Sequence, residues 1–353
     1  MTTATPILKP VKLTAGRLPS WTTGIVLTVA LLLSATLFFA AGTPGFIRIL
    51  LVGALLFTAI MMAASLIVEG GRKAKDRLAT ITVTCAFGLA LLPLVSLVIS
   101  VIQKGSERFD LEFFTYSMRN VVGEGGGAVH AITGTLWVTG IATLISVPIG
   151  ILAAIYLVEY GTGALARSIT FFVDVMTGIP SIVAGLFAYA LFVLFFGPGT
   201  KSGLAGAVAL TVLMIPVVVR SIEELLKIVP NELREAAYAL GVPKWLTIVK
   251  VVLPTAAAGI VTGVMLAVAR VIGETAPLLI AAGFTQSLNN NPLSGPMMTL
   301  PVYVYRSYID QGNPASAYLD RAWAGALTLI LIVMVLNLAG RLVAAKFAPK
   351  AGR

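Results

Sequence analysis

Residues 264–280 read VMLAVARVIGETAPLLI, an apolar run of membrane-spanning length with an arginine and a glutamate near its middle. A transmembrane helix needs about 20 predominantly apolar residues. A charged side chain at its centre costs about 2.5–3.5 kcal/mol on insertion scales, and ionisable groups at that depth default to a functional role. Arg270 and Glu274 are therefore the first candidate site residues.

The composition of the whole chain is that of a polytopic helical membrane protein. Of its 353 residues, 58% are hydrophobic and only 11% are charged, whereas soluble domains are about a quarter charged. The net charge of +10 would suggest a nucleic-acid partner in a soluble protein. In this chain it indicates cationic loops that contact lipid headgroups, and no nucleic-acid partner is expected.

Eight apolar segments are long enough to span a membrane. The fifth is the least regular because it contains Asp174 and the sequence GIP at 178–180. Its first ten residues are expected along the membrane interface, with the crossing starting near Pro180. The predicted spans are 22–42, 47–68, 79–103, 131–157, 169–197, 203–219, 255–282 and 322–344.

The loops between these spans differ in their content of Lys and Arg. With a cytoplasmic N-terminus, 17 of these residues lie on the cytoplasmic side and 7 on the outer side. The positive-inside rule therefore predicts that both termini are cytoplasmic. Residues 104–130 and 283–321 then form two long outer loops, and both have the composition of irregular structure.

The pair Arg270 and Glu274 lies one turn apart on one face of a continuous α-helix. That face continues a stripe of small residues: Gly259, Gly263 and Ala267. Such stripes let helices approach closely in membranes, so the charges should face protein or a water-filled cavity. The pair could simply join two helices. We favour a site in which Arg270 presents a positive fork to an anion, Glu274 holds it and Thr275 adds a donor.

The segment 220–254 contains a short amphipathic helix, predicted at 231–240. Asn231 is a plausible N-cap after Pro230, and Gly241 fits the residue that stops a helix. The polar side of this helix carries both signs of charge, which is unlike a helix that lies on lipid. Its small side suits docking against a partner protein; this side consists of Ala236, Ala237 and Ala239.

Signatures of enzymes and of nucleotide binding are missing from the sequence. One His and one Cys cannot build a usual zinc site. The stretch GPGTKSG at 197–203 fails as a phosphate loop, because Thr200 stands where the pattern needs glycine. We therefore predict no catalytic residue, no metal and no cofactor in this chain, and no ATP binding by the chain alone.

Two motifs carry a resemblance to a known family. EAAYALG at 235–241, followed by VVLP at 251–254, resembles the EAA loop of ABC importer permeases, with Val251 in the position of Ile. Over roughly residues 78–348 the chain further resembles the PstA family of phosphate importer permeases. The segments that carry this resemblance are REAAYALGVPKW, ARVIGETAPLL, YLVEYG (156–161), IPSIVAGLF (179–187) and LKIVP (226–230).

The resemblance implies an all-α type I ABC importer permease fold with about eight transmembrane helices. Residues 1–70 would be an N-terminal extension with two of them, and 71–353 would be the six-helix transporter domain with the EAA loop at 220–254. It implies a multi-pass protein of the bacterial plasma (inner) membrane. Its partners would be a sister permease (PstC-like), a dimer of nucleotide-binding subunits (PstB-like) and an extracytoplasmic phosphate-binding protein (PstS-like).

The resemblance also assigns roles to residues. ATP would be used by the partner ATPase, and Arg270 and Glu274 would be linked to the passage of phosphate. The ATPase-docking set would consist of Arg220, Glu235, Ala236, Ala237, Gly241, Leu253 and Pro254.

Two alternative functions stay open at this point. A permease for another oxyanion, such as sulfate, molybdate or phosphonate, could use the same Arg and Glu. A stand-alone secondary transporter or channel could use the pair as a proton relay, but it would leave the EAA loop unexplained. Co-purification with an ATPase subunit separates the importer from the stand-alone transporter.

Overall fold

The structure, a computed structural model, describes residues 16–43 and 45–347, and it contains helices and no strand in these ranges. Seven of the helices are long and apolar enough to cross a membrane, and a bent pair supplies an eighth candidate span. This confirms the prediction of an all-α polytopic protein. The seven are α1 (Thr22–Ala40), α2 (Phe46–Val68), α3 (Gly71–Gly105), α5 (Val129–Ile155), α8 (Gly203–Ile228), α11 (Leu253–Val271) and α14 (Ala315–Phe347).

The remaining elements are short or bent. The bent pair is α6 (Ala164–Gly178) and α7 (Ser181–Phe196). A π-helical segment, Tyr156–Tyr160, extends α5, and another, Ile248–Val252, precedes α11. The short helices are Ser106–Arg108 (a 3-10 turn), α4 (Leu111–Thr115), α9 (Asn231–Ala239), α10 (Lys244–Thr247), α12 (Ala276–Ala281) and α13 (Leu300–Ile309).

The chain divides into two compact units, the first ending at Val98 and the second beginning at Ile99. In the first unit, α1 and α2 pack as a hairpin in which the hydroxyl of Ser34 donates to the carbonyl of Ile49 at 2.8 Å. Beyond α2, the Arg77 guanidinium bonds Glu69 at 2.6 Å and lowers the pKa of that carboxyl to about 2. The predicted domain division at residue 70 stays a prediction.

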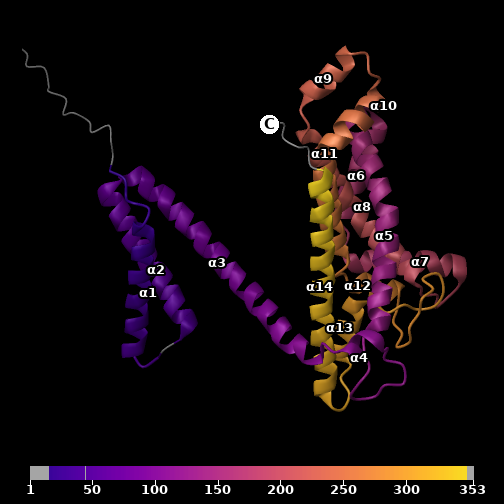
Figure 1. Ribbon diagram of the computed structural model, residues 1–353, viewed down its shortest axis with the longest axis horizontal. Helices are drawn as coiled ribbons and strands as arrows, with labels where there is room; N and C mark the ends of the chain where they lie inside the picture. Colours follow the sequence, from indigo (N-terminus) through magenta and orange to yellow (C-terminus); the bar gives the residue numbers. More distant parts are fainter. Residues whose placement is uncertain (1–15, 44, 348–353) are drawn as a thin grey trace, which may run out of the picture. The chain divides into compact units, whose positions relative to one another are not determined.

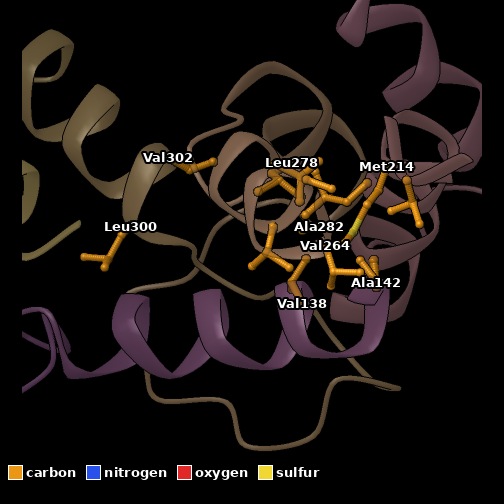
Figure 2. Packing of buried hydrophobic residues seen from close by; sticks show 14 of the residues in the cluster. Val138, Ala142, Met214, Val264, Leu278, Ala282, Leu300 and Val302 are labelled. Carbon is orange, nitrogen blue, oxygen red and sulfur yellow. The ribbon is translucent and has the colours of Figure 1, made fainter. Parts of the chain in front are cut away.

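The second unit is organised around α8, which packs against α5, α6, α7, α11 and α12. The most apolar stretch of α8 is 61% buried, whereas the corresponding stretches of the other six long helices are 6–33% buried. Its first turns are built from small residues, which let neighbouring helices approach closely. Figure 2 shows Met214 of α8 among Val138 of α5, Val264 of α11 and Leu278 of α12, in the core that holds the unit together.

The fifth apolar segment is broken at GIP, and α6 and α7 meet at an angle of 109°. Ile179 is extended because the ring of Pro180 disfavours a helical conformation in the residue before it. Figure 1 shows that α7 runs across the direction of α5 and α14. The expectation that a crossing starts near Pro180 is therefore not matched by the direction of α7.

Other element ends differ from those expected. The helix predicted at 203–219 continues to Ile228, and the span predicted at 255–282 is interrupted after Val271. The predicted outer loop 283–321 contains α13 and the start of α14. The N-terminus of α13 is held close to α5: the amide of Leu300 donates to Thr135 Oγ1 at 2.7 Å, and a side chain at Gly134 would collide with the carbonyl of Met298.

Candidate functional site

A cavity of about 230 Å³ brings Arg270 and Glu274 together in the second unit. Arg270 stands in the last turn of α11, and Glu274 lies in the turn between α11 and α12. The opposite walls come from α6, α7 and α8, and they include Thr177, Ser181 and Pro216. The cavity thus combines a fixed positive charge, a carboxyl group and two hydroxyl groups.

The two charges are not one turn apart on a helix, so this part of the prediction is wrong. The helix ends at Val271, and α12 begins at Ala276 with Pro277 in its first turn, where a missing N–H is tolerated. No ion pair joins Arg270 to Glu274 in the described part of the chain. Arg270 is exposed in this single chain and Glu274 is partly buried. Thr275 is partly buried and is not among the residues that line the cavity.

The stripe of small residues on α11 packs against α8. A Cβ atom added to Gly259 would lie 2.8 Å from Leu225 Cδ2, and one added to Gly263 would lie 3.2 Å from Ser221 Cβ. The predicted close approach of two helices is therefore confirmed. Arg270 lies beside this contact, at the wall of the cavity.

The EAA segment forms α9, Asn231–Ala239, with the predicted stop at its end. Gly241 has a φ of +75°, and its amide donates to the carbonyl of Tyr238 at 2.9 Å. This positive φ is the left-handed conformation that favours glycine after a helix. The predicted N-cap is wrong: Pro230 holds that position, and the Asn231 side chain accepts a bond from Arg234 at 3.4 Å.

The surface of α9 exposes several predicted docking residues and some unforeseen apolar ones. Glu235, Ala236 and Gly241 are exposed, whereas Ala237 packs inward against its own chain. Near the start of α11, Leu253 is partly buried and Pro254 is exposed. Unforeseen exposed apolar side chains are Leu233, Tyr238, Leu240 and Trp245. Leu240 is 84% exposed.

Arg220 is placed apart from the other predicted docking residues. It lies on α8 and forms ion pairs with Asp174 of α6 and with Glu223 of its own helix. Its contacts are therefore with the bundle. The ion pair between Arg220 and Asp174 also explains how the irregular fifth segment accommodates a carboxylate.

A buried ion pair behind α9 was not predicted from the sequence. Arg234 of α9 donates from Nε and Nη2 to Glu159 Oε1 at 3.0 and 2.9 Å, and the two side chains are only 11% and 5% exposed. Arg234 also donates to the backbone carbonyls of Leu226 and Val229. Lys244 bonds the carbonyl of Glu159. This set, which we call the Glu159–Arg234 link, joins α9 to the ends of α5 and α8.

We expect the change Arg234→Gln to loosen α9 strongly. Removing one partner of a buried ion pair costs about 3–5 kcal/mol because the other charge stays buried. Amide hydrogen exchange in α9 should become faster, and the double variant Glu159→Gln, Arg234→Gln should recover part of the protection. The control is Arg167→Gln, because Arg167 is exposed and lies before α9 in the same unit. If amide hydrogen exchange in α9 is equally fast in Arg234→Gln and in this control, the Glu159–Arg234 link does not hold α9.

Comparisons with known proteins agree with this architecture. A model of the family described as binding-protein-dependent transport system inner membrane component matches residues 146–353. The phosphate transport system permease protein PstA 1 of Mycobacterium tuberculosis is 46% identical over 275 residues, which cover 77% of this chain and 88% of that protein. PstA of Yersinia pestis is 38% identical over 283 residues, 79% of this chain and 92% of that protein.

One solved structure is similar in fold. It is a bacterial alginate ABC transporter in complex with an alginate pentasaccharide-bound periplasmic protein, with a TM-score of 0.56, 13% identity, and coverage of 78% of this chain and 96% of that chain. The chain belongs to the family of binding-protein-dependent transport system inner membrane components, and its fold is that of an ABC importer permease. The curated relatives described above are PstA phosphate permeases. This membership implies a multi-pass membrane protein that works with an ATPase and a substrate-binding protein.

Proposed function

We propose that this chain forms half of the translocation path of an ATP-driven importer of inorganic phosphate. The observation that carries the proposal is the cavity that places Arg270 and Glu274 in one space. Phosphate is an anion, and a dehydrated oxyanion in a membrane needs a counter-charge that never loses its proton, which arginine provides. Glu274 keeps the empty site neutral and prevents binding too tight for release. The names of the relatives favour phosphate as the anion.

The energy for transport comes from a partner ATPase in this proposal, and the chain itself is not an enzyme and holds no cofactor. The exposed surface of α9 and the residues after it dock on that ATPase, chiefly through Glu235, Ala236 and Gly241. The apolar side chains Leu240 and Trp245 add buried contact area when the partner is present. A sister permease of the PstC type covers the face on which Arg270 is exposed, and a PstS-type protein delivers phosphate from outside.

The test is uptake of radiolabelled phosphate into vesicles that hold this chain and its partners, with and without ATP. Uptake that needs ATP supports the importer, and uptake driven by a proton gradient without ATP contradicts it. Sulfate uptake under the same conditions tests the second candidate, because Arg and Glu alone do not distinguish tetrahedral oxyanions.

We expect a reporter fused at the C-terminus to be cytoplasmic and one inserted within 286–294 to be outside. The physical reason is the excess of Lys and Arg in the loops assigned to the inner side. Part of that excess lies in residues 1–15 and 348–353, outside the described residues. Alkaline phosphatase and fluorescent-protein fusions measure the two sides. An external C-terminus would contradict an even number of crossings in the bacterial plasma membrane.

A further inference from the structure

A second cavity, of about 270 Å³, lies at the other end of the second unit. It is formed by α13, the start of α14 and the residues after α12. Figure 1 shows α13 and α4 at the end of the bundle opposite α9 and α10. In the proposed topology this is the outer end, where the substrate arrives. We call it the outer cavity.

The wall of the outer cavity contains a fully buried arginine with incomplete hydrogen bonding. Arg321 is 1% exposed, and its Nη1 donates to the carbonyls of Gly123 and Gly125 at 2.6 and 2.9 Å. The guanidinium also lies 4.5 Å from the ring centre of Tyr318. Its Nη2 is buried and has no hydrogen-bond partner, and no carboxylate pairs with it among the described residues. A buried charge without a counter-charge is costly unless something else pairs with it.

A second buried donor lies in the same wall. Tyr303 is 2% exposed, and its hydroxyl lies near Ser307 but forms no hydrogen bond of good geometry. Burial raises the pKa of Tyr303, so the hydroxyl keeps its proton and can donate. Unsatisfied buried groups are uncommon in native structures, and a bound water or ion is one physical explanation of such a group. Both residues line the outer cavity, and a small rotation of each side chain would bring its shielded donor atom to the cavity surface.

The net charge of the outer cavity decides between a water and an ion. The lining includes Arg306 and Arg321, against a single carboxylate, Asp310, which pairs with Arg306 at 2.6 Å. The formal charge is therefore positive. A water molecule can accept bonds from Arg321 and Tyr303, but it leaves the charge uncompensated. An oxyanion both accepts these bonds and neutralises the charge.

We propose that the outer cavity is a second anion site, which holds a small tetrahedral oxyanion at the entrance to the path. Arg321 supplies the buried positive charge, Tyr303 donates through its hydroxyl, and the more accessible Arg306 attracts the anion. The site is separate from the cavity at Arg270; its place at the entrance to the path and the choice of phosphate as the probe rest on the proposed function.

The experiment measures binding of radiolabelled inorganic phosphate to the assembled importer in nanodiscs, without the binding protein. All variants are made in an Arg270→Gln background, so that the inner cavity contributes little. We expect phosphate still to bind, and sulfate but not chloride at equal ionic strength to displace it. Arg306→Gln and Tyr303→Phe should each raise the Kd about tenfold, as expected for a lost hydrogen bond to a charged group.

The control variant is Arg119→Gln, because Arg119 is an exposed cation of the outer loop that does not line the cavity. It should leave the Kd unchanged. Tyr303→Phe keeps the ring and its packing, so the thermal unfolding of the complex should not change. If Arg306→Gln and Tyr303→Phe both fold as the parent does and bind phosphate with an unchanged Kd, the proposal is overturned.

Two further outcomes would also overturn it. Displacement of phosphate by chloride would show a general attraction of charge rather than a site. Absence of phosphate binding, together with weaker docking of the binding protein to Arg306→Gln, would show that a carboxylate of that protein occupies the cavity. The proposed function fails in a different experiment, the uptake assay, if Arg270→Gln takes up phosphate as well as the parent. That result would leave the phosphate-binding measurement unaffected.

Discussion

The change Arg270→Gln should reduce phosphate uptake per assembled complex by about 10- to 100-fold, as expected for the loss of a hydrogen bond from a charged group. Glutamine keeps some of the length and a hydrogen-bond donor but removes the fixed positive charge. The complex should still assemble, because Arg270 is exposed in this chain and forms no ion pair among the described residues. Uptake is measured in vesicles and normalised to the amount of complex.

Arg270→Lys separates charge from geometry in this prediction. A lysine restores the positive charge but not the planar fork that binds two oxygens of one anion. Uptake should therefore recover only in part. Full recovery with lysine would show that the fork is not needed, and a loss of uptake that follows loss of assembly would show that Arg270 joins helices.

The second large effect is expected for Gly241→Asp, which should leave ATP hydrolysis uncoupled from transport. Gly241 has a φ of +75° at the end of α9, and a side chain there is strained by about 1–2 kcal/mol. No atom of the described residues lies within 4 Å of an added Cβ, so the aspartate side chain would point to open space. In the proposed complex that space belongs to the ATPase, and a charge there would be desolvated without a partner.

Two control variants make this prediction specific. Gly241→Asn has the same shape and tolerates the same backbone conformation, so it should preserve more coupling than the aspartate. Gly199→Asp places the same charge at another exposed glycine of positive φ, +80°, which lies in the turn between α7 and α8. The readouts are ATP hydrolysis and uptake in one preparation. Equal coupling in Gly241→Asp and Gly199→Asp would contradict a role of α9 in docking.

The long helices could be predicted because a membrane span depends on length and apolar composition, which a single sequence displays. The predicted spans match helices or the bent pair, and the stop at Gly241 followed from the conformational freedom of glycine. The close contact between α11 and α8 followed from the stripe that contains Gly259 and Gly263. These features are local, or they depend on one face of one helix.

The features that were missed depend on breaks and on distant partners. The helix at Arg270 was assumed to be continuous, although Gly273 and Pro277 together carried a signal for the interruption. The helix α13 was hidden by the loop composition that precedes it, although Pro301 in its first turn is a usual helix start. The Glu159–Arg234 link joins residues 75 positions apart, and nothing in either local sequence identifies the partner.

The cavity at Arg270 is intermediate between these cases. The sequence indicated which two charges are unusual, because each stands in an apolar run. It could not indicate that they lie on either side of a helix break, or that Thr177 and Ser181 share their cavity. Those positions result from the bend between α6 and α7 before Pro180 and from the packing of α7 against α8 and α12.

The most direct test of the central claim is phosphate uptake by the doubly neutral variant Arg270→Gln, Glu274→Gln, measured per assembled complex in vesicles with ATP. If the cavity is an anion site, this variant assembles and hydrolyses ATP but transports phosphate no better than Arg270→Gln alone. If the variant transports phosphate as well as the parent, the charges are not required for passage of the anion, and the account of Arg270 and Glu274 is wrong.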